Sequence, residues 1–141
     1  MLSTIRALFR LISFALLMTA ISMAVPSARW LFGGEIAFQV HRRGMFIIHR
    51  ILGIKLNIIG DLPKDPALIM CNHPSYYDIF FNIGHRQAVM VVADQFKNWP
   101  FVGWLGQGLN TIWVRRHCPD AGKKIRYEIV QRIKNGLSIF V

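Results

Sequence analysis

The chain has 141 residues, of which 53% are hydrophobic, and it carries ten more basic than acidic side chains. A chain of this length can hold one modest domain. High hydrophobicity together with high positive charge is unusual for a soluble globule and suits a protein that rests on an anionic membrane. The sequence has no zinc-ligand spacing, no RNA-binding aromatic block and no groove-fitting basic helix, so nucleic acid is disfavoured as a partner. Cys71 and Cys118 have no CxxC partner and indicate reduced thiols.

An apolar stretch lies near the N-terminus. Leu11–Val25 is apolar apart from Ser13, Thr19 and Ser22, and Pro26 is expected to end it. Counted from Leu8, the stretch has about 18 residues, close to the minimum that spans a ~30 Å hydrocarbon core. A transmembrane anchor is the favoured interpretation. A helix lying in the interface or packed in a two-helix membrane platform, and a cleaved signal peptide, remain as alternatives.

Residues 27–53 mix apolar side chains with basic ones, and only Glu35 is acidic. The pattern predicts one or two amphipathic helices, with breaks expected at Gly33-Gly34 and at Gly44. Either the basic side is simply solvated, or the apolar side enters the acyl region while the cations meet lipid phosphates. The cations of this segment favour a cytoplasmic side, although Arg6 and Arg10 favour the opposite orientation. The basic and histidine residues are Arg29, His41, Arg42, Arg43, His49 and Arg50.

From residue 54 onward, short apolar runs alternate with turns and helical patterns, which is typical of an α/β domain. Strands are expected at residues 54–59, 67–71, 87–93, 111–114 and 137–141, and helices at 75–83, 94–97 and 119–135. Residues 101–109 are expected to form a helix or a loop. The last helix is basic, with Lys123, Lys124, Arg126, Arg132 and Lys134 facing outward. We therefore expect an N-terminal membrane helix or helices in residues 1–53, followed in residues 54–141 by a mixed sheet flanked by helices.

The segment Asn72-His73-Pro74-Ser75-Tyr76-Tyr77-Asp78 follows one of the expected buried strands. Histidine transfers protons near neutral pH, and a carboxylate can orient the imidazole and stabilise its charged form. His73 and Asp78 can meet if the histidine lies in the turn before a helix and the aspartate in its first turns. Pro74 suits the first helical position. The structural alternative is a strand-to-helix turn with Asn72 as its cap and an incidental histidine.

A second segment runs from Lys97 through Pro100 and Gly103 to Arg115 and Arg116. Together the two segments resemble the motif blocks of the glycerolipid acyltransferases, the 1-acyl-glycerol-3-phosphate acyltransferase group. In that family an Asn-His-x4-Asp block is followed by a Pro-Phe-x-Gly segment and a strand that ends in arginine. Two blocks in the same order are more specific than either one alone. The resemblance covers about residues 45–141.

The resemblance implies an O-acyltransferase of phospholipid biosynthesis. It would move a fatty acyl group from a thioester of CoA or acyl carrier protein to the hydroxyl of a lysophospholipid such as 1-acyl-glycerol-3-phosphate. His73 would take the hydroxyl proton as the oxygen attacks the thioester, and Asp78 would hold the imidazole. No acyl-enzyme, resident cofactor or metal site is implied. The catalytic domain would lie on the cytoplasmic side of the cytoplasmic membrane.

The second block would bind the substrate. Arg116 matches the arginine that ends the family's block and could bind a phosphate through two parallel hydrogen bonds. Arg115 could do this instead, because strand alternation directs only one of the two toward the site. Pro100 and Gly103 would shape the backbone for close approach. Lys97 would contact an anionic head group or be merely solvated.

Three features leave alternatives open. Arg115 stands where many members have Asp, and Gly103-Trp104-Leu105 is similar to lyso-ornithine lipid O-acyltransferases, so the acceptor could be lyso-ornithine lipid. The family's Pro-Glu-Gly block would follow a strand such as residues 137–141, so we expect an N-terminal part of a longer enzyme, truncated at the C-terminus and inactive alone. A non-catalytic membrane-binding protein is the rival from another class, and a hydrolase is disfavoured because there is no G-x-S-x-G elbow.

Overall fold

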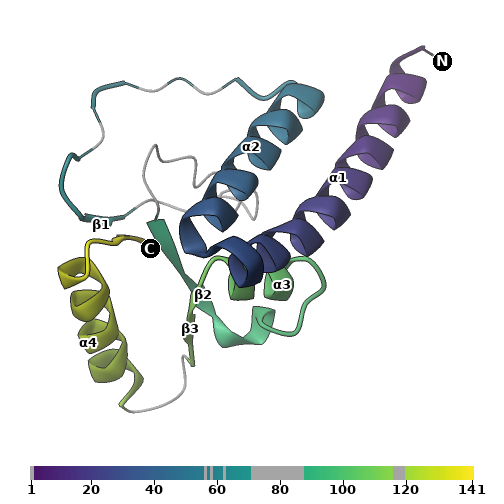
Figure 1. The fold of residues 1–141 in the computed structure, drawn as a ribbon. Helices are drawn as coiled ribbons and strands as arrows, with labels where there is room; N and C mark the ends of the chain where they lie inside the picture. The colour runs from purple at the N-terminus through teal and green to yellow at the C-terminus, as the bar shows by residue number, and fades with distance from the viewer. Residues whose placement is uncertain (1, 56, 58, 62, 71–87, 116–119) are drawn as a thin grey trace.

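The computed structural model describes residues 2–55, 57, 59–61, 63–70, 88–115 and 120–141 (Figure 1). Two long helices, α1 (Leu2–Phe32) and α2 (Gly34–Leu52), precede a region of short strands and helices, so the predicted α/β class is confirmed. The later elements are β1 (Leu68–Ile69), β2 (Ala88–Ala93), the 3-10 helix η2 (Asp94–Phe96), α3 (Val102–Gly108), β3 (Ile112–Val114), α4 (Ala121–Lys134) and β4 (Ser138–Phe140). The predicted division at residues 53 and 54 stays a prediction.

Helix α1 continues through Pro26 to Phe32, so the expected end at the proline was wrong. A proline removes its own N–H from the helical ladder, and packing can offset this loss. Val25 is fully buried here, and a Cβ on Gly108 of α3 would lie only 2.8 Å from the Pro26 nitrogen. Contacts with α2 and α3 therefore stabilise the helical conformation of α1 on the C-terminal side of the proline. Within α1, Ser3–Phe32 is long and apolar enough to cross a membrane.

Helix α2 runs back along α1, and the two form a helical hairpin (Figure 1). The break expected at Gly33 is present, because its φ of 90° lies in the left-handed region that glycine tolerates. The break expected at Gly44 is absent. A Cβ at this position would overlap the side chain of Ile21, so this glycine serves close helix packing instead of ending the helix.

The four described strands form one sheet in the order β1-β4-β2-β3, and all three pairings are parallel. We expected a mixed sheet, and the described pairings correct this. The connection from β2 to β3 contains α3, and the connection from β3 to β4 contains α4. A crossover that contains a helix returns the chain to the end of the sheet where the previous strand began, and this produces parallel pairing.

Two predicted strands differ from the structure. Residues 67–71 were expected to form a buried strand, but β1 has two residues at the sheet edge, and the side chains of Leu68 and Met70 are exposed. The described positions of residues 54–59 form no strand. Alternating polarity is a local signal, whereas a strand also needs a neighbouring strand to pair with. Neither segment could be placed correctly from its own sequence.

Side-chain alternation gives the sheet two distinct faces. Val89, Ile112 and Ile139 are buried on one face and pack against Ile129 and Ile133 of α4. Successive side chains of a strand point to opposite faces. The neighbouring side chains Met90, Val92 and Trp113 accordingly face a cavity lined by residues of α2 and α3. The sheet therefore separates α4 from the layer that contains α1, α2 and α3 (Figure 1).

Candidate functional site

The carboxyl ends of β2 and β3 bring two charged residues together. The two strands are parallel, with Ala93 opposite Val114, so the residues that follow them meet at the same sheet edge. The Nε of Arg115 donates a hydrogen bond to Oδ2 of Asp94 over 3.1 Å. The Arg115 side chain is 82% exposed and that of Asp94 is 31% exposed. This ion pair contributes little to stability, because exposed pairs are typically worth about 0–1 kcal/mol.

The geometry of this pair leaves the outer part of Arg115 available. Within the described ranges Asp94 is the partner of the Arg115 side chain, and it binds the Nε. The two terminal amino groups of the guanidinium therefore remain able to contact an anion, and they present donors in a planar fork. Sequence analysis named Arg115 as one of two alternatives for phosphate binding but missed Asp94. The 21-residue separation between the two gave no local signal of their contact.

The segment that carries Lys97 and Gly103 folds back on itself. The Gly103 N–H bonds to the Trp99 carbonyl over 2.9 Å, and a Cβ on Gly103 would overlap the carbonyl oxygen of Lys97. Glycine is therefore required at position 103 for this close approach. The side chains of Lys97 and Pro100 are exposed. The described structure thus places all three residues in one turn, and their contact with substrate stays a prediction.

Phe101 has an unusual backbone conformation. Its φ of 65° and ψ of −56° are those of a strained γ-turn, and the Val102 N–H closes this turn on the Pro100 carbonyl over 2.8 Å. The Phe101 side chain packs against the buried cluster of α1 and α2, and its ring lies 6.3 Å from that of Trp104, edge to face. This turn therefore connects the second block to the helical hairpin. Sequence analysis did not predict it.

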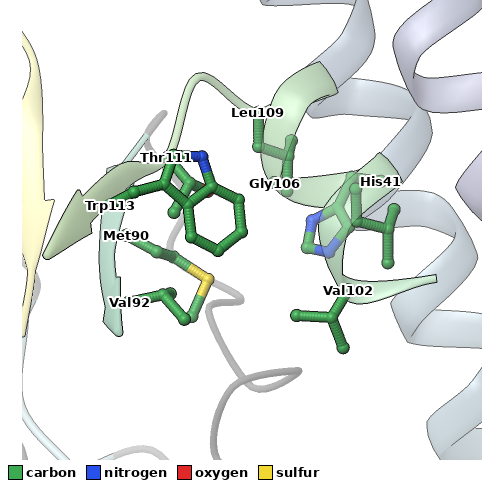
Figure 2. Close-up of a pocket in the computed structure, with 9 residues that line it drawn as sticks. His41, Met90, Val92, Val102, Gly106, Leu109, Thr111 and Trp113 are labelled. Atoms are coloured by element: carbon green, nitrogen blue, oxygen red, sulfur yellow. The ribbon is translucent and has the colours of Figure 1, made fainter. Parts of the chain in front are cut away.

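His41 of α2 lines a cavity of about 20 Å³ between the helical hairpin and the sheet. Its imidazole and the indole of Trp113 lie on opposite sides of this cavity (Figure 2). The side chain is 2% exposed, and its Nδ1 has no hydrogen-bond partner among the described residues. Burial lowers the pKa of His41 from 6.5 to about 4. The sequence pattern groups His41 with the cations of residues 27–53, but at neutral pH it is a neutral, buried side chain.

The expected catalytic pair falls outside the described residues. His73 and Asp78 lie in residues 71–87, and Arg116 lies in residues 116–119, so their assignment stays a prediction. Within the described ranges no group of three or more His, Cys, Asp or Glu side chains could hold a metal ion. The described part of the site therefore consists of Asp94 and Arg115, which follow β2 and β3, and the turn from Lys97 to Gly103.

Comparisons with known proteins agree with the motif blocks. A family model described as Acyltransferase matches residues 53–141, which include both segments. A lyso-ornithine lipid O-acyltransferase of Rhodobacter capsulatus is 29% identical over 86 residues, which cover 61% of this chain and 31% of that protein. A protein of the same name from Pseudomonas aeruginosa is 23% identical over 90 residues, or 64% of this chain and 34% of the relative.

A 1-acyl-sn-glycerol-3-phosphate acyltransferase of Neisseria gonorrhoeae is 24% identical over 90 residues. The match covers 62% of this chain and 35% of that protein. The chain thus spans about a third of the length of the curated relatives that it matches. No solved structure matched the chain.

Proposed function

Because this chain belongs to the acyltransferase family, we propose that the protein carrying it transfers a fatty acyl group from an acyl thioester to the hydroxyl of a lysolipid. The observation that carries this proposal is the family match over residues 53–141, a range that includes both motif blocks. The names of the relatives support a lysolipid acceptor, because they act on lyso-ornithine lipid or on 1-acyl-sn-glycerol-3-phosphate. The activity belongs to lipid biosynthesis.

In the proposed mechanism His73 acts as a general base. It removes the proton from the acceptor hydroxyl while the hydroxyl oxygen attacks the thioester carbonyl. The C–S bond then breaks, the acyl group forms an ester with the acceptor, and the thiolate of CoA or of a carrier protein takes up the proton. Asp78 holds the imidazole and stabilises its positive charge. The acyl thioester is a co-substrate, and the reaction needs neither a metal nor a covalent acyl-enzyme.

The acceptor head group is proposed to bind at the carboxyl ends of β2 and β3. Arg115 supports this proposal, because Asp94 holds its Nε and leaves two terminal amino groups for an anion. Arg116 is the second candidate, since it matches the arginine that ends the family's block. Both known acceptor types carry an anionic group, a phosphate or a carboxylate, and a guanidinium binds either one through paired hydrogen bonds. Lyso-ornithine lipid is therefore retained as the alternative acceptor.

The N-terminal helices support membrane association. Large apolar side chains of α1 and α2 are exposed although such residues are normally buried. These residues include Leu8, Phe9, Leu11, Leu16, Phe32, Phe46 and Ile47. A surface of this kind is stable in contact with lipid. We propose that α1 anchors the protein in the cytoplasmic membrane, with residues 54–141 on the cytoplasmic side.

Substitution of His73 in the protein expressed from its complete coding sequence tests the proposed reaction. Turnover of an acyl thioester with a lysolipid should fall at least ~100-fold in His73→Ala, since general-base catalysis contributes about 10²–10⁴-fold. The matched control is Ser75→Ala, which removes a neighbouring hydroxyl and should retain turnover because no acyl-enzyme forms. Full activity of His73→Ala, or loss of activity in Ser75→Ala, would contradict the mechanism.

The acceptor is identified in the same assay. Separate reactions contain 1-acyl-sn-glycerol-3-phosphate, lyso-ornithine lipid or water as the acceptor. Ester formation with one lysolipid assigns the acceptor, whereas thioester cleavage with water alone indicates a hydrolase. Absence of thioester-dependent activity in the parent protein, with membrane binding retained, supports the non-catalytic alternative.

A further inference from the structure

Helix α4 presents an outer face that the proposed reaction does not yet use. Its inner side packs on the sheet through Ile129 and Ile133. On its outer side two large apolar side chains are exposed, Tyr127 at 69% and Val130 at 46%. Four basic side chains of the helix are also exposed: Lys123, Lys124, Arg126 and Lys134.

The spacing of these residues produces a continuous stripe. Lys123, Tyr127, Val130 and Lys134 follow one another at intervals of four, three and four residues, so they lie in a row along one side of the helix. Lys124 adjoins this row, because it is three residues from Tyr127. The stripe thus has an apolar centre between cationic ends. We call these five residues the α4 stripe.

Two acidic residues lie close to the stripe along the chain: Asp120, the N-cap of α4, which precedes Lys123 by three residues, and Glu128 within the helix. Glu128 is the one acidic residue in the helix, and its Oε1 accepts a 2.8 Å hydrogen bond from Arg132. Arg132 also donates to the Asn110 carbonyl over 2.9 Å, so it belongs to the packed side, in contrast to the outward position that we predicted. The charge of Arg132 is already paired with that of Glu128, whereas the lysines of the stripe are exposed to solvent.

The position of α4 argues against the bilayer as the partner of this stripe. Most of the large apolar side chains that are exposed lie on α1 and α2, and the sheet separates these helices from α4 (Figure 1). A membrane that contacts the hairpin therefore leaves the α4 stripe directed away from it. A basic surface with an exposed tyrosine at its centre is instead suited to a protein partner, since tyrosine is enriched in interface cores and charges steer association.

We propose that the α4 stripe is the docking surface for an acidic protein. The proposal rests on the proposed function, which requires an acyl thioester carried by CoA or by a protein. A small acidic carrier protein, which holds the acyl group on its prosthetic thiol, has the negative charge that complements the lysines of this stripe. Tyr127 and Val130 form the apolar contact, and Lys123, Lys124 and Lys134 pair with carboxylates around it.

The test compares two donors with the same acyl group in the protein expressed from its complete coding sequence. One donor is a purified acidic acyl carrier protein, and the other is acyl-CoA. The test variant is Lys123→Glu/Lys124→Glu, and the control is Lys55→Glu/Lys64→Glu, which reverses two exposed lysines outside α4. We expect kcat/KM for the carrier-borne donor to fall about tenfold or more in the test variant only. For acyl-CoA, kcat/KM should change less than about twofold in both variants.

Binding measurements separate this proposal from the proposed reaction. The carrier protein, labelled for fluorescence anisotropy, should bind the parent with a Kd that rises with salt, and the test variant about tenfold more weakly. Tyr127→Ala should weaken binding without changing the charge. If no donor supports turnover, the proposed reaction fails, while the anisotropy still decides the docking. Equal losses with both donors, or unchanged carrier binding, overturn the proposal. Reduced binding to anionic phosphatidylglycerol vesicles with unchanged carrier binding would instead assign the stripe to lipid.

Discussion

His41 shows how position within the fold changes the chemistry of a single residue. The sequence around it is rich in arginine, yet the side chain is enclosed between α2, α3 and the sheet. A charged imidazole is unfavourable there because the side chain is buried and no described group bonds to its Nδ1. The neutral form is therefore the one compatible with the packed interface.

A dependence of stability on pH follows from this burial. The unfolded chain binds a proton at His41 below pH 6.5, whereas the folded protein does so only below about pH 4, since burial lowers the pKa. Stability should therefore fall as the pH is lowered through this window, by at most about 3 kcal/mol. Thermal unfolding in detergent, followed by circular dichroism between pH 7 and pH 4, measures the effect.

The contribution of His41 is isolated with two variants. His41→Gln removes the titrating group and should flatten the dependence of the unfolding temperature on pH. Arg43→Gln changes a charge on the exposed side of the same helix and should keep the parent's slope. An unchanged slope in His41→Gln would show that other groups cause the acid sensitivity.

At the scale of the elements, backbone contacts restrict which residues can stand in the turn that leads into the first residues of α3. Gly103 contacts the Lys97 carbonyl, and a backbone atom cannot rotate away as the end of a side chain can. The γ-turn at Phe101 directs its ring toward α1 and α2, where the ring packs against their buried cluster. These two contacts constrain the turn from Lys97 to Gly103 and attach it to the helical hairpin.

Replacement of two glycines by alanine tests this constraint. Gly103→Ala should destabilise the protein by about 1–3 kcal/mol, because the new Cβ forces the turn apart. Gly122→Ala in α4 is the control, since nothing lies within 4 Å of a Cβ there. It should be neutral or stabilise the helix by up to about 1 kcal/mol. Denaturant titrations of both variants measure these changes, and equal effects would contradict the role assigned to Gly103.

At the scale of the whole molecule, the exposed apolar side chains are concentrated on one side of the sheet, whereas exposed basic side chains are present on both sides. Most of the large exposed apolar residues lie on the α1–α2 hairpin, and the α4 stripe lies across the sheet from them (Figure 1). The excess of ten basic side chains adds attraction to an anionic surface. This arrangement predicts that membrane binding depends on α1 and is independent of the outer face of α4.

Flotation of the purified protein with anionic vesicles checks this prediction. Aspartate at the three exposed leucines, Leu8, Leu11 and Leu16, should move most of the protein out of the floated fraction. Each buried leucine is worth about 1.5–3 kcal/mol, so the loss exceeds tenfold in partitioning. Substitution of Tyr127 and Val130 by serine is the control and should leave flotation unchanged. Flotation of the triple variant at the level of the parent would exclude α1 as the anchor.

Local patterns in the sequence were sufficient for much of the fold. Helical periodicity and glycine positions predicted α2 and α4, and apolar runs predicted β2, β3 and β4. The two motif blocks indicated the acyltransferase family, which the match over residues 53–141 then confirmed. The roles of His73 and Asp78 also come from the sequence and stay predictions, because both residues lie outside the described ranges.

Only the tertiary structure decided what depends on contacts between distant segments. Packing against α2 and α3 carries α1 past Pro26, parallel register brings Asp94 to Arg115, and the hairpin encloses His41. Periodicity reports which face of an element is apolar, because it is a property of neighbouring residues. The partner of that face is chosen by the packing of the whole chain, and this determines burial, ion pairing and protonation.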